Sequence, residues 1–294
     1  MTDAIRHRTL SLLGGEVAFL DFGDFARPVD LVWCHATGFN AETYLSTLAP
    51  LAADLRILAL DSRGHGRTTL PADPAALQGW VPYAYDLEQF LDAAGIAHPV
   101  VLGGHSMGGA TCLIAADRLG ARVKGLALFD PVIVPRMASF IRYVPGLEQL
   151  MGRGNPMASG ALRRKPRFAS REAAFSAYHG RGPFRTWPDE VLAGYVEAGF
   201  RETGDGVTLA CTPEWEAATF MGATAQSLWP VLGRVSCPIQ VFKARERSTC
   251  YVPDNHRLAI QSGRVFQTVE GTTHFLPIER PDLVREAVRD MCAG

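Results

Sequence analysis

The chain has 294 residues, 47% of them hydrophobic and 20% charged, so it can bury a sizeable core and is not a disordered protein. Its formal net charge of -1 gives no overall field that would attract nucleic acid or an anionic membrane surface. It begins without a secretory apolar segment and has no apolar run long enough to span a bilayer, so we expect a cytoplasmic protein with no nucleic-acid partner and no membrane insertion.

Short apolar runs alternate with helical patterns along most of the chain. This alternation predicts an α/β fold with a mainly parallel central sheet flanked by helices. Apolar residues at helical spacing predict crossover helices over 83–94 and 281–291. The expected strands cover residues 17–21, 31–34, 57–60, 99–102, 125–129, 239–242 and 265–269.

The middle of the chain breaks this alternation. From about residue 134 the β-rich runs stop, and Arg, Pro, Gly, Met and aromatic residues take over. A stretch of this length is too long for a loop in a compact domain, so we expect an inserted, mainly helical cap subdomain over 134–230. The α/β core is then expected in two parts, 1–133 and 231–294. Most aromatic side chains of the insertion are expected in its own core, and a minority in the wall of an apolar substrate pocket.

The most specific motif is the run 103–109, Gly-Gly-His-Ser-Met-Gly-Gly, which directly follows an apolar run. It places Ser106 in the frame G-x-S-x-G, between an expected strand and an apolar helix over 107–119. Such a strand-to-helix turn holds a serine hydroxyl clear of the backbone, where it can attack a carbonyl group. Gly104 and Gly108 are expected because side chains there would collide across the tight turn. The motif therefore predicts a nucleophile at Ser106.

Three further segments lie where strands of the expected sheet end, which is where open α/β sheets place their sites. Residues 35–38 form a small-residue turn after an apolar strand, and this turn could aim backbone N–H groups at a developing oxyanion. Asp130 stands at the tip of the strand that follows the Ser106 helix. His274 lies in a turn after the last expected strand.

Read together, these segments resemble the α/β-hydrolase superfamily, in its serine-nucleophile, esterase- or lipase-like branch with a helical cap. The elbow around Ser106 carries the resemblance, together with His35-Ala36-Thr37-Gly38, which departs from the usual His-Gly by one methyl group. The turn 61–68 is similar to the family's D-x-R-G-H-G-x-S/T motif, and 271–282 looks like the segment with the catalytic histidine. The order serine, acid, histidine also agrees.

The resemblance implies a role for each of these positions. His274 would be the general base that takes the Ser106 proton and later gives it to the leaving group. Backbone N–H groups of Met107 and Thr37 would form the oxyanion hole. His65 and His105 are expected to make structural hydrogen bonds inside their turns, and His35 to shape the oxyanion turn.

The acid of the triad has more than one candidate. Family members most often carry it after the strand over 239–242, but no aspartate stands in 243–249. Glu246 is available there, but it stands between two arginines. The competing interpretation is a charged loop in which Glu246 forms local ion pairs. Other members place the acid one strand earlier, so Asp130 is preferred, with Glu246 and then Asp254 as alternatives. The acid would fix the imidazole tautomer and stabilise the imidazolium.

Two sets of side chains receive no catalytic role. The cysteines are scattered without metal-ligand spacing, so we expect neither a metal site nor a disulfide framework. A basic cluster in the insertion could attract an anionic group, although a solvated helix face is the preferred interpretation. That cluster comprises Arg163, Arg164, Lys165, Arg167 and Arg171.

These observations predict a serine hydrolase that cleaves small apolar carboxylic esters through an acyl-enzyme, without a cofactor. Relatives with aspartate at the elbow, the dehalogenases and epoxide hydrolases, are excluded by Ser106. A C–C bond hydrolase, lactonase, thioesterase, amidase or acyltransferase would use the same triad and stays an alternative. A ligand receptor on the same fold, without turnover, is the alternative from another functional class. The sequence predicts neither the natural substrate nor the oligomeric state.

Overall fold

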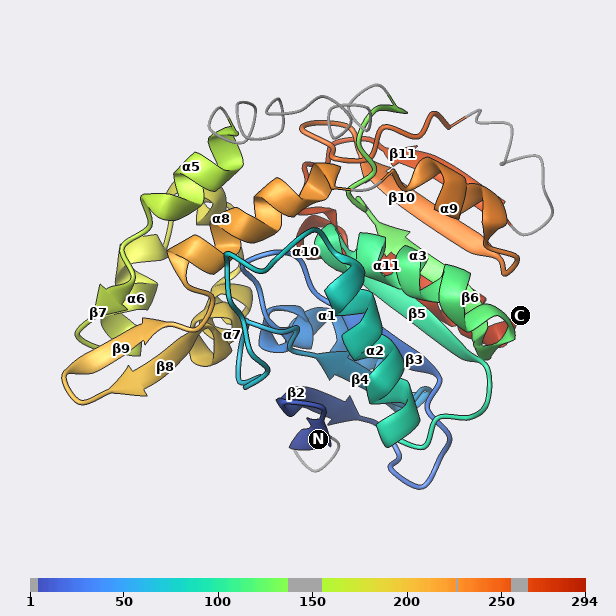
Figure 1. Cartoon of the computed structure of the whole chain (residues 1–294), viewed down its shortest axis with the longest axis horizontal. Helices are drawn as coiled ribbons and strands as arrows, with labels where there is room; N and C mark the ends of the chain where they lie inside the picture. Colours follow the sequence, from blue (N-terminus) through green and yellow to red (C-terminus); the bar gives the residue numbers. More distant parts are fainter. Residues whose placement is uncertain (1–4, 137–154, 226, 255–263) are drawn as a thin grey trace.

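The computed structural model describes residues 5–136, 155–225, 227–254 and 264–294. Within them, one sheet has the strand order β1-β2-β4-β3-β5-β6-β10-β11 (Figure 1). The hairpin β1–β2 and the β2–β4 pair are antiparallel, and the pairs from β4 to β11 are parallel. The predicted α/β fold class is confirmed. The strands are β1 Ile5–Leu12, β2 Gly15–Phe22, β3 Leu31–Cys34, β4 Ile57–Leu60, β5 Val100–His105, β6 Val123–Phe129, β10 Ile239–Ala244 and β11 Arg264–Val269.

Each of the seven predicted strands is present, with ends that differ by a few residues. The largest extension is in β5, which continues to His105 because its pairing with β6 runs on to Phe129. Strand β1 was not predicted. Its side chains are mostly exposed or half-buried at the edge of the sheet, and apolar alternation is confined to Leu10 and Leu12, too short a pattern to mark a strand.

Helices cover both faces of the sheet. On one face α2 (Val81–Ala93), α3 (Met107–Leu119) and α9 (Trp229–Arg234) contribute to one hydrophobic cluster with the sheet. On the other face α1 (Leu45–Leu48) and α11 (Pro281–Ala293) contribute to a second cluster. The nearly uniform apolar surface of α3 follows from its place between the sheet and the helices α2 and α9.

The described segment 155–221 forms a layer of its own beside the sheet (Figure 1). Its helices are α5 (Pro156–Leu162), α6 (Arg171–Tyr178), α7 (Asp189–Gly199) and α8 (Pro213–Met221). A small antiparallel sheet in the order β7-β9-β8 joins them, with bounds Arg167–Phe168, Gly206–Leu209 and Phe200–Thr203. Buried aromatic and aliphatic side chains from these helices and strands form their own cluster. The cap boundaries 134–230 stay a prediction.

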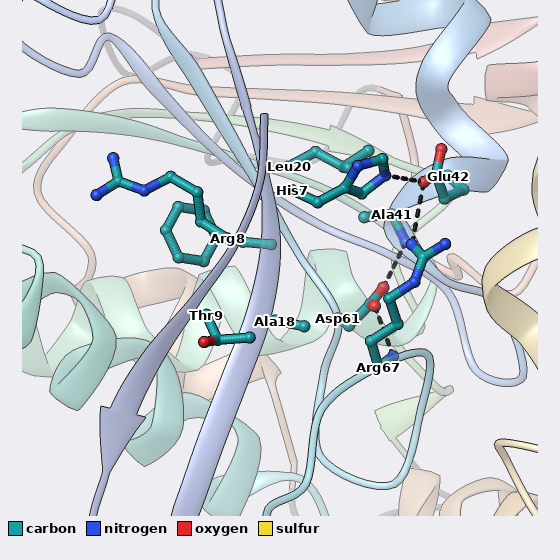
Figure 2. A pocket seen from close by; sticks show the side chains of 10 residues that line it. His7, Arg8, Thr9, Ala18, Leu20, Ala41, Glu42, Asp61 and Arg67 are labelled. Atoms are coloured by element: carbon teal, nitrogen blue, oxygen red, sulfur yellow. Dashed lines mark hydrogen bonds and ion pairs between the residues drawn. The ribbon is translucent and has the colours of Figure 1, made fainter. Parts of the chain in front are cut away.

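The turn over 61–68 braces the loop that follows β3. The Asp61 carboxylate is buried and accepts N–H groups from Ala41 and Arg67 at 2.8 Å each (Figure 2). A Cβ on Gly66 would lie 2.1 Å from this carboxylate, so glycine is required there. The turn also borders a cavity of about 210 Å³ next to β1, where Arg67 pairs with Glu42. This cavity holds no nucleophile, and the motif is structural.

The described helices include none with the length and hydropathy of a membrane-spanning segment. In the same residues, His, Cys, Asp and Glu side chains nowhere gather in threes in a way that could hold a metal ion.

Candidate active site

Ser106 lies at the junction between β5 and α3, in a backbone conformation that L-residues rarely adopt. Its φ is 57° and its ψ is -119°, which stores strain in the turn. The glycines on either side permit this geometry. A Cβ on Gly104 would lie 2.6 Å from the carbonyl carbon of Gly108, and a Cβ on Gly108 would lie 2.2 Å from the carbonyl oxygen of Cys34. The predicted collision across the turn is therefore confirmed for Gly104, whereas a side chain on Gly108 would collide with the end of β3.

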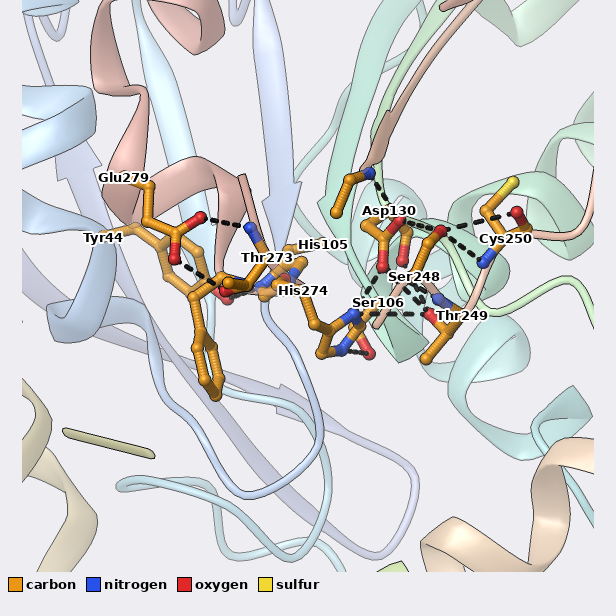
Figure 3. A network of polar contacts seen from close by, with 12 residues as sticks. Tyr44, His105, Ser106, Asp130, Ser248, Thr249, Cys250, Thr273, His274 and Glu279 are labelled. Carbon is orange, nitrogen blue, oxygen red and sulfur yellow. Dashed lines mark hydrogen bonds and ion pairs between the residues drawn. The ribbon is translucent and has the colours of Figure 1, made fainter. Parts of the chain in front are cut away.

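Ser106, His274 and Asp130 form one hydrogen-bonded chain (Figure 3). The Nε2 of His274 lies 3.0 Å from the Ser106 Oγ, and its Nδ1 lies 2.6 Å from Oδ2 of Asp130. These residues come from three different strand ends, after β5, β6 and β11. An imidazole held in this way by a carboxylate can accept a proton from the hydroxyl on its other side.

Asp130 is completely buried and has more donors than the imidazole alone. Oδ1 accepts the N–H of Ala244 at 2.9 Å and the hydroxyl of Ser248 at 2.5 Å, and Oδ2 accepts the N–H of Thr249 at 3.0 Å. Burial raises the pKa of Asp130, but the hydrogen bonds from His274, Ser248 and Thr249 outweigh it and lower that pKa below its usual value. Asp130 therefore stays ionised beside the imidazole.

The loop after β10 thus supplies donors to the acid and does not carry the acid itself. Glu246 in this loop is exposed, and its N–H donates to the carbonyl of Thr272. Asp254 is half-exposed and pairs with Lys243 at 2.8 Å. Among the described carboxylates, Asp130 is the one in contact with His274. The sequence reasoning missed the donors Ser248 and Thr249, because an ordinary Ser-Thr pair in a loop gives no signal.

Over residues 36–39, the turn leaves one backbone N–H without an acceptor among the described residues. The N–H groups of Ala36, Gly38 and Phe39 donate to the Tyr44 hydroxyl, to Nε2 of His65 and to the carbonyl of Ala36, respectively. Within the described part of the chain, the Thr37 N–H has no acceptor. The Met107 N–H lies at the first position of α3, where a helix offers no internal partner. Both donors belong to segments that line the cavity around Ser106.

Three buried histidines support this turn as neutral rings. Nε2 of His35 accepts the N–H of Ser62 at 2.9 Å, and Nε2 of His65 accepts the N–H of Gly38 at 3.0 Å. Each ring donates its Nδ1–H to a nearby carbonyl. Burial lowers the pKa of His35 to about 4, and burial, with a smaller contribution from the neighbouring His35 ring, lowers the pKa of His65 to about 3. The expected structural roles of these histidines are consistent with this geometry.

The third ring, His105, links the oxyanion turn to the backbone of the base. Its Nδ1 accepts the Tyr44 hydroxyl at 2.7 Å, and its Nε2 donates to the carbonyl of His274 at 2.7 Å. Since the Tyr44 hydroxyl also accepts the Ala36 N–H, a continuous chain of hydrogen bonds runs from residue 36 to residue 274 (Figure 3). Tyr44 was not predicted, because a tyrosine next to a polar loop carries no pattern of its own.

Ser106 opens into a cavity of about 490 Å³ between the strand ends and the inserted elements. A cavity of this size suits a small organic substrate. Its apolar wall includes Phe39, Met157, Phe184, Trp187, Phe220 and Phe275, and its polar wall includes Arg164, Tyr178, Arg181, Tyr195 and Glu216.

The structure corrects the expectation for Arg164. Instead of lying on a solvated helix face, its guanidinium contacts Glu216 at 2.5 Å and the Tyr195 hydroxyl at 2.5 Å in the cavity wall. Arg163, Lys165 and Arg167 are exposed as expected, although Arg167 lies in β7 and not on a helix. Arg171 is partly buried and pairs with Glu197 and Glu202, so it also departs from the expected solvated face. Nothing in a run of basic residues shows which one points inward, because that depends on how α5 packs against α8.

The chain was compared with known proteins. A family model described as the alpha/beta hydrolase family matches residues 31–287. The human (lyso)-N-acylphosphatidylethanolamine lipase is 29% identical over 136 residues, which cover 44% of this chain and 40% of the lipase. The (E)-2-((N-methylformamido)methylene)succinate hydrolase of Acinetobacter baylyi is 32% identical over 108 residues, which cover 37% of this chain and 35% of that protein. The matched regions thus span less than half of these relatives.

Solved structures agree over nearly the whole chain. E-2-(acetamidomethylene)succinate hydrolase superimposes with a TM-score of 0.75 at 17% identity and covers 99% of this chain and 100% of its own. The thioesterase domain from the curacin biosynthetic pathway gives a TM-score of 0.75 at 16% identity and covers 97% and 99%. Identities this low show the fold alone. Since the family model covers most of the residues and includes the strand ends that carry Ser106, Asp130 and His274, this chain belongs to the alpha/beta hydrolase family.

Proposed function

We propose that the chain is a serine hydrolase of carboxylic esters, with Ser106 as nucleophile, His274 as general base and Asp130 as the acid. The observation that carries this proposal is the Ser106–His274–Asp130 chain, with distances of 3.0 and 2.6 Å, at the end of a largely apolar cavity. The family membership supports hydrolysis in general. The choice of esters as substrates is the proposal's own step.

The reaction proceeds in two halves. Nε2 of His274 takes the Ser106 proton as Oγ attacks the ester carbonyl, and the resulting oxyanion accepts the N–H groups of Met107 and Thr37. The imidazolium then protonates the departing alkoxide, which leaves as the alcohol, and the acyl group stays on Oγ. In the second half His274 takes a proton from water, hydroxide adds to the acyl carbon, and Ser106 recovers its proton as the acid departs. No cofactor or metal takes part.

Asp130 contributes by fixing the orientation of the imidazole. Its contact with Nδ1 leaves Nε2 facing Ser106, and its negative charge stabilises the imidazolium that forms. The donors from Ser248 and Thr249 keep that carboxylate in one position. In this proposal the inserted elements serve as a cap that excludes water and shapes the acyl pocket.

The test is a turnover assay on a panel of neutral p-nitrophenyl esters, alkyl esters, lactones and thioesters. We expect multiple turnovers with esters, and a loss of kcat on the order of a million-fold in Ser106→Ala. Circular dichroism and the thermal midpoint of Ser106→Ala, compared with the parent chain, control for misfolding. If Ser106→Ala retains most of the activity, the mechanism is wrong. Exclusive turnover of lactones or thioesters would replace the ester assignment, and tight ligand binding without turnover would favour a receptor.

A further inference from the structure

The polar wall of the active-site cavity carries more positively charged than negatively charged side chains. Its ionisable side chains away from the Ser106 end are Arg164, Arg181 and Glu216. Two guanidinium groups therefore stand against one carboxylate.

Arg164 and Glu216 neutralise each other. The guanidinium donates to the Glu216 carboxylate at 2.5 Å and to the hydroxyl groups of Tyr178 and Tyr195 at 3.3 and 2.5 Å. Three protein acceptors thus occupy Arg164, which leaves it poorly placed to receive a further anion. The pair packs against the oxyanion turn, since a Cβ on Gly38 would lie 2.5 Å from Oε1 of Glu216.

Arg181 has no such partner. It lies on the segment that follows α6, and its backbone is fixed, because its N–H donates to the Tyr178 carbonyl and its carbonyl accepts the Phe184 N–H, each at 3.0 Å. The residue is exposed, and among the described residues no carboxylate lies within ion-pair distance of its guanidinium. The charge of Arg181 is therefore the uncompensated charge of the described cavity wall.

We propose that the cavity takes an ester whose apolar acyl chain ends in a carboxylate, with that carboxylate paired to Arg181. The inference rests on the proposed function and deepens it by naming the substrate class, the half-esters of dicarboxylic acids. Hydrolysis breaks the ester C–O bond, adds water and releases an alcohol and a dicarboxylate. A guanidinium presents parallel N–H donors that match a carboxylate, which makes arginine well suited to this contact.

The experiment compares monomethyl adipate with methyl hexanoate, the neutral ester of the same acyl length, by titration of released acid. We expect the parent chain to favour the anionic ester by about tenfold in kcat/KM, a modest factor because Arg181 is partly solvated. Arg181→Gln should remove this preference by lowering kcat/KM for monomethyl adipate, whereas Arg181→Lys should keep part of it. Added salt should weaken the preference in the parent chain.

Arg185→Gln is the matched control, because Arg185 is an exposed arginine of the same segment that does not line the cavity. It should behave as the parent chain does. The inference is overturned if the parent chain and Arg181→Gln show the same ratio of kcat/KM for the two esters. It is also overturned if the parent chain prefers methyl hexanoate. Either result leaves the esterase proposal intact.

A lack of turnover with every ester would instead count against the proposed function, and binding then decides the substrate class. Calorimetry on Ser106→Ala should show tighter binding of monomethyl adipate than of methyl hexanoate. The combination of Ser106→Ala with Arg181→Gln should lose that difference. Equal binding of the two esters to Ser106→Ala would also overturn the inference.

Discussion

The two sides of the active-site cavity are built in different ways. On the side of the sheet, Ser106, His274 and Asp130 stand after the ends of parallel strands, and each is held by hydrogen bonds to the others or to the backbone. On the side of the inserted elements the wall is aromatic, with one buried ion pair and one exposed arginine. The difference teaches that strand ends fix reacting atoms precisely, whereas packed helices and loops determine which substrate fits.

Apart from Ser106→Ala, the largest expected loss of activity comes from Asp130, on the side of the sheet. Asp130→Asn should lower kcat on the order of ten-thousand-fold, because the amide no longer favours the tautomer that leaves Nε2 able to accept the Ser106 proton. Glu246→Gln and Asp254→Asn are matched carboxylate-to-amide controls, and both should stay within about twofold of the parent chain. Steady-state kinetics on one neutral ester measures all three. A larger loss in Glu246→Gln than in Asp130→Asn would move the acid to the loop after β10.

The contact between the two sides gives the next largest effect. Gly38 has a φ of 76°, and a Cβ there would lie 2.5 Å from Oε1 of Glu216, which Arg164 holds in place. Gly38→Ala should therefore lower the free energy of unfolding by about 3 kcal/mol, through backbone strain and the forced displacement of a buried carboxylate. It should also reduce kcat, because the neighbouring Thr37 N–H moves.

Gly180→Ala is the control for that substitution. Gly180 has a φ of 68°, but a Cβ there would meet no atom within 4 Å. It should lose only about 1 kcal/mol, the cost of the backbone conformation. Urea denaturation of the two variants measures the difference. Equal losses would mean that the inserted elements do not press on the oxyanion turn.

The smallest effect concerns the support behind the oxyanion turn. Burial, with a smaller contribution from the neighbouring His35 ring, lowers the pKa of His65 to about 3 in the folded chain, against about 6.5 when unfolded. Between these values the unfolded chain binds the proton and the folded chain does not. The contribution of the neutral His65 ring to the free energy of unfolding is therefore fully present above about pH 6.5, and it is lost progressively as the pH falls toward 3. Protonation of His65 would also put a proton on Nε2, which would then face the Gly38 N–H that it accepts in the neutral ring.

Urea denaturation at about pH 7.5 and about pH 5.5 measures this contribution. The parent chain should lose about 1.4 kcal/mol more stability over this range than His65→Gln, which has no ring to protonate. His179→Gln is the control, because His179 is an exposed histidine paired with Asp189. Parallel losses in the parent chain and His65→Gln would show that His65 is not held neutral.

Much of the fold was predictable because it rests on local patterns. Buried parallel strands read as apolar runs, and the positions of Gly104, Ser106 and Gly108 record a turn whose sterics allow few other residues. The resemblance to a known family then directed attention to His274, and the position of Asp130 at the tip of the strand after the Ser106 helix favoured it as the acid. Strand β1 escaped prediction because it is an edge strand with few apolar side chains, so its pattern is short and weak.

The sequence by itself determined the class of fold, the strained serine and the set of acids that could serve it. The tertiary structure decided which acid touches His274, because that choice depends on strands β6 and β10 lying side by side. It also decided that Arg164 points inward to Glu216 while Arg181 keeps an unpaired charge among the described residues. The physical reason is that a local pattern records backbone sterics and burial, whereas the partner of a charged side chain is set by residues distant in the chain.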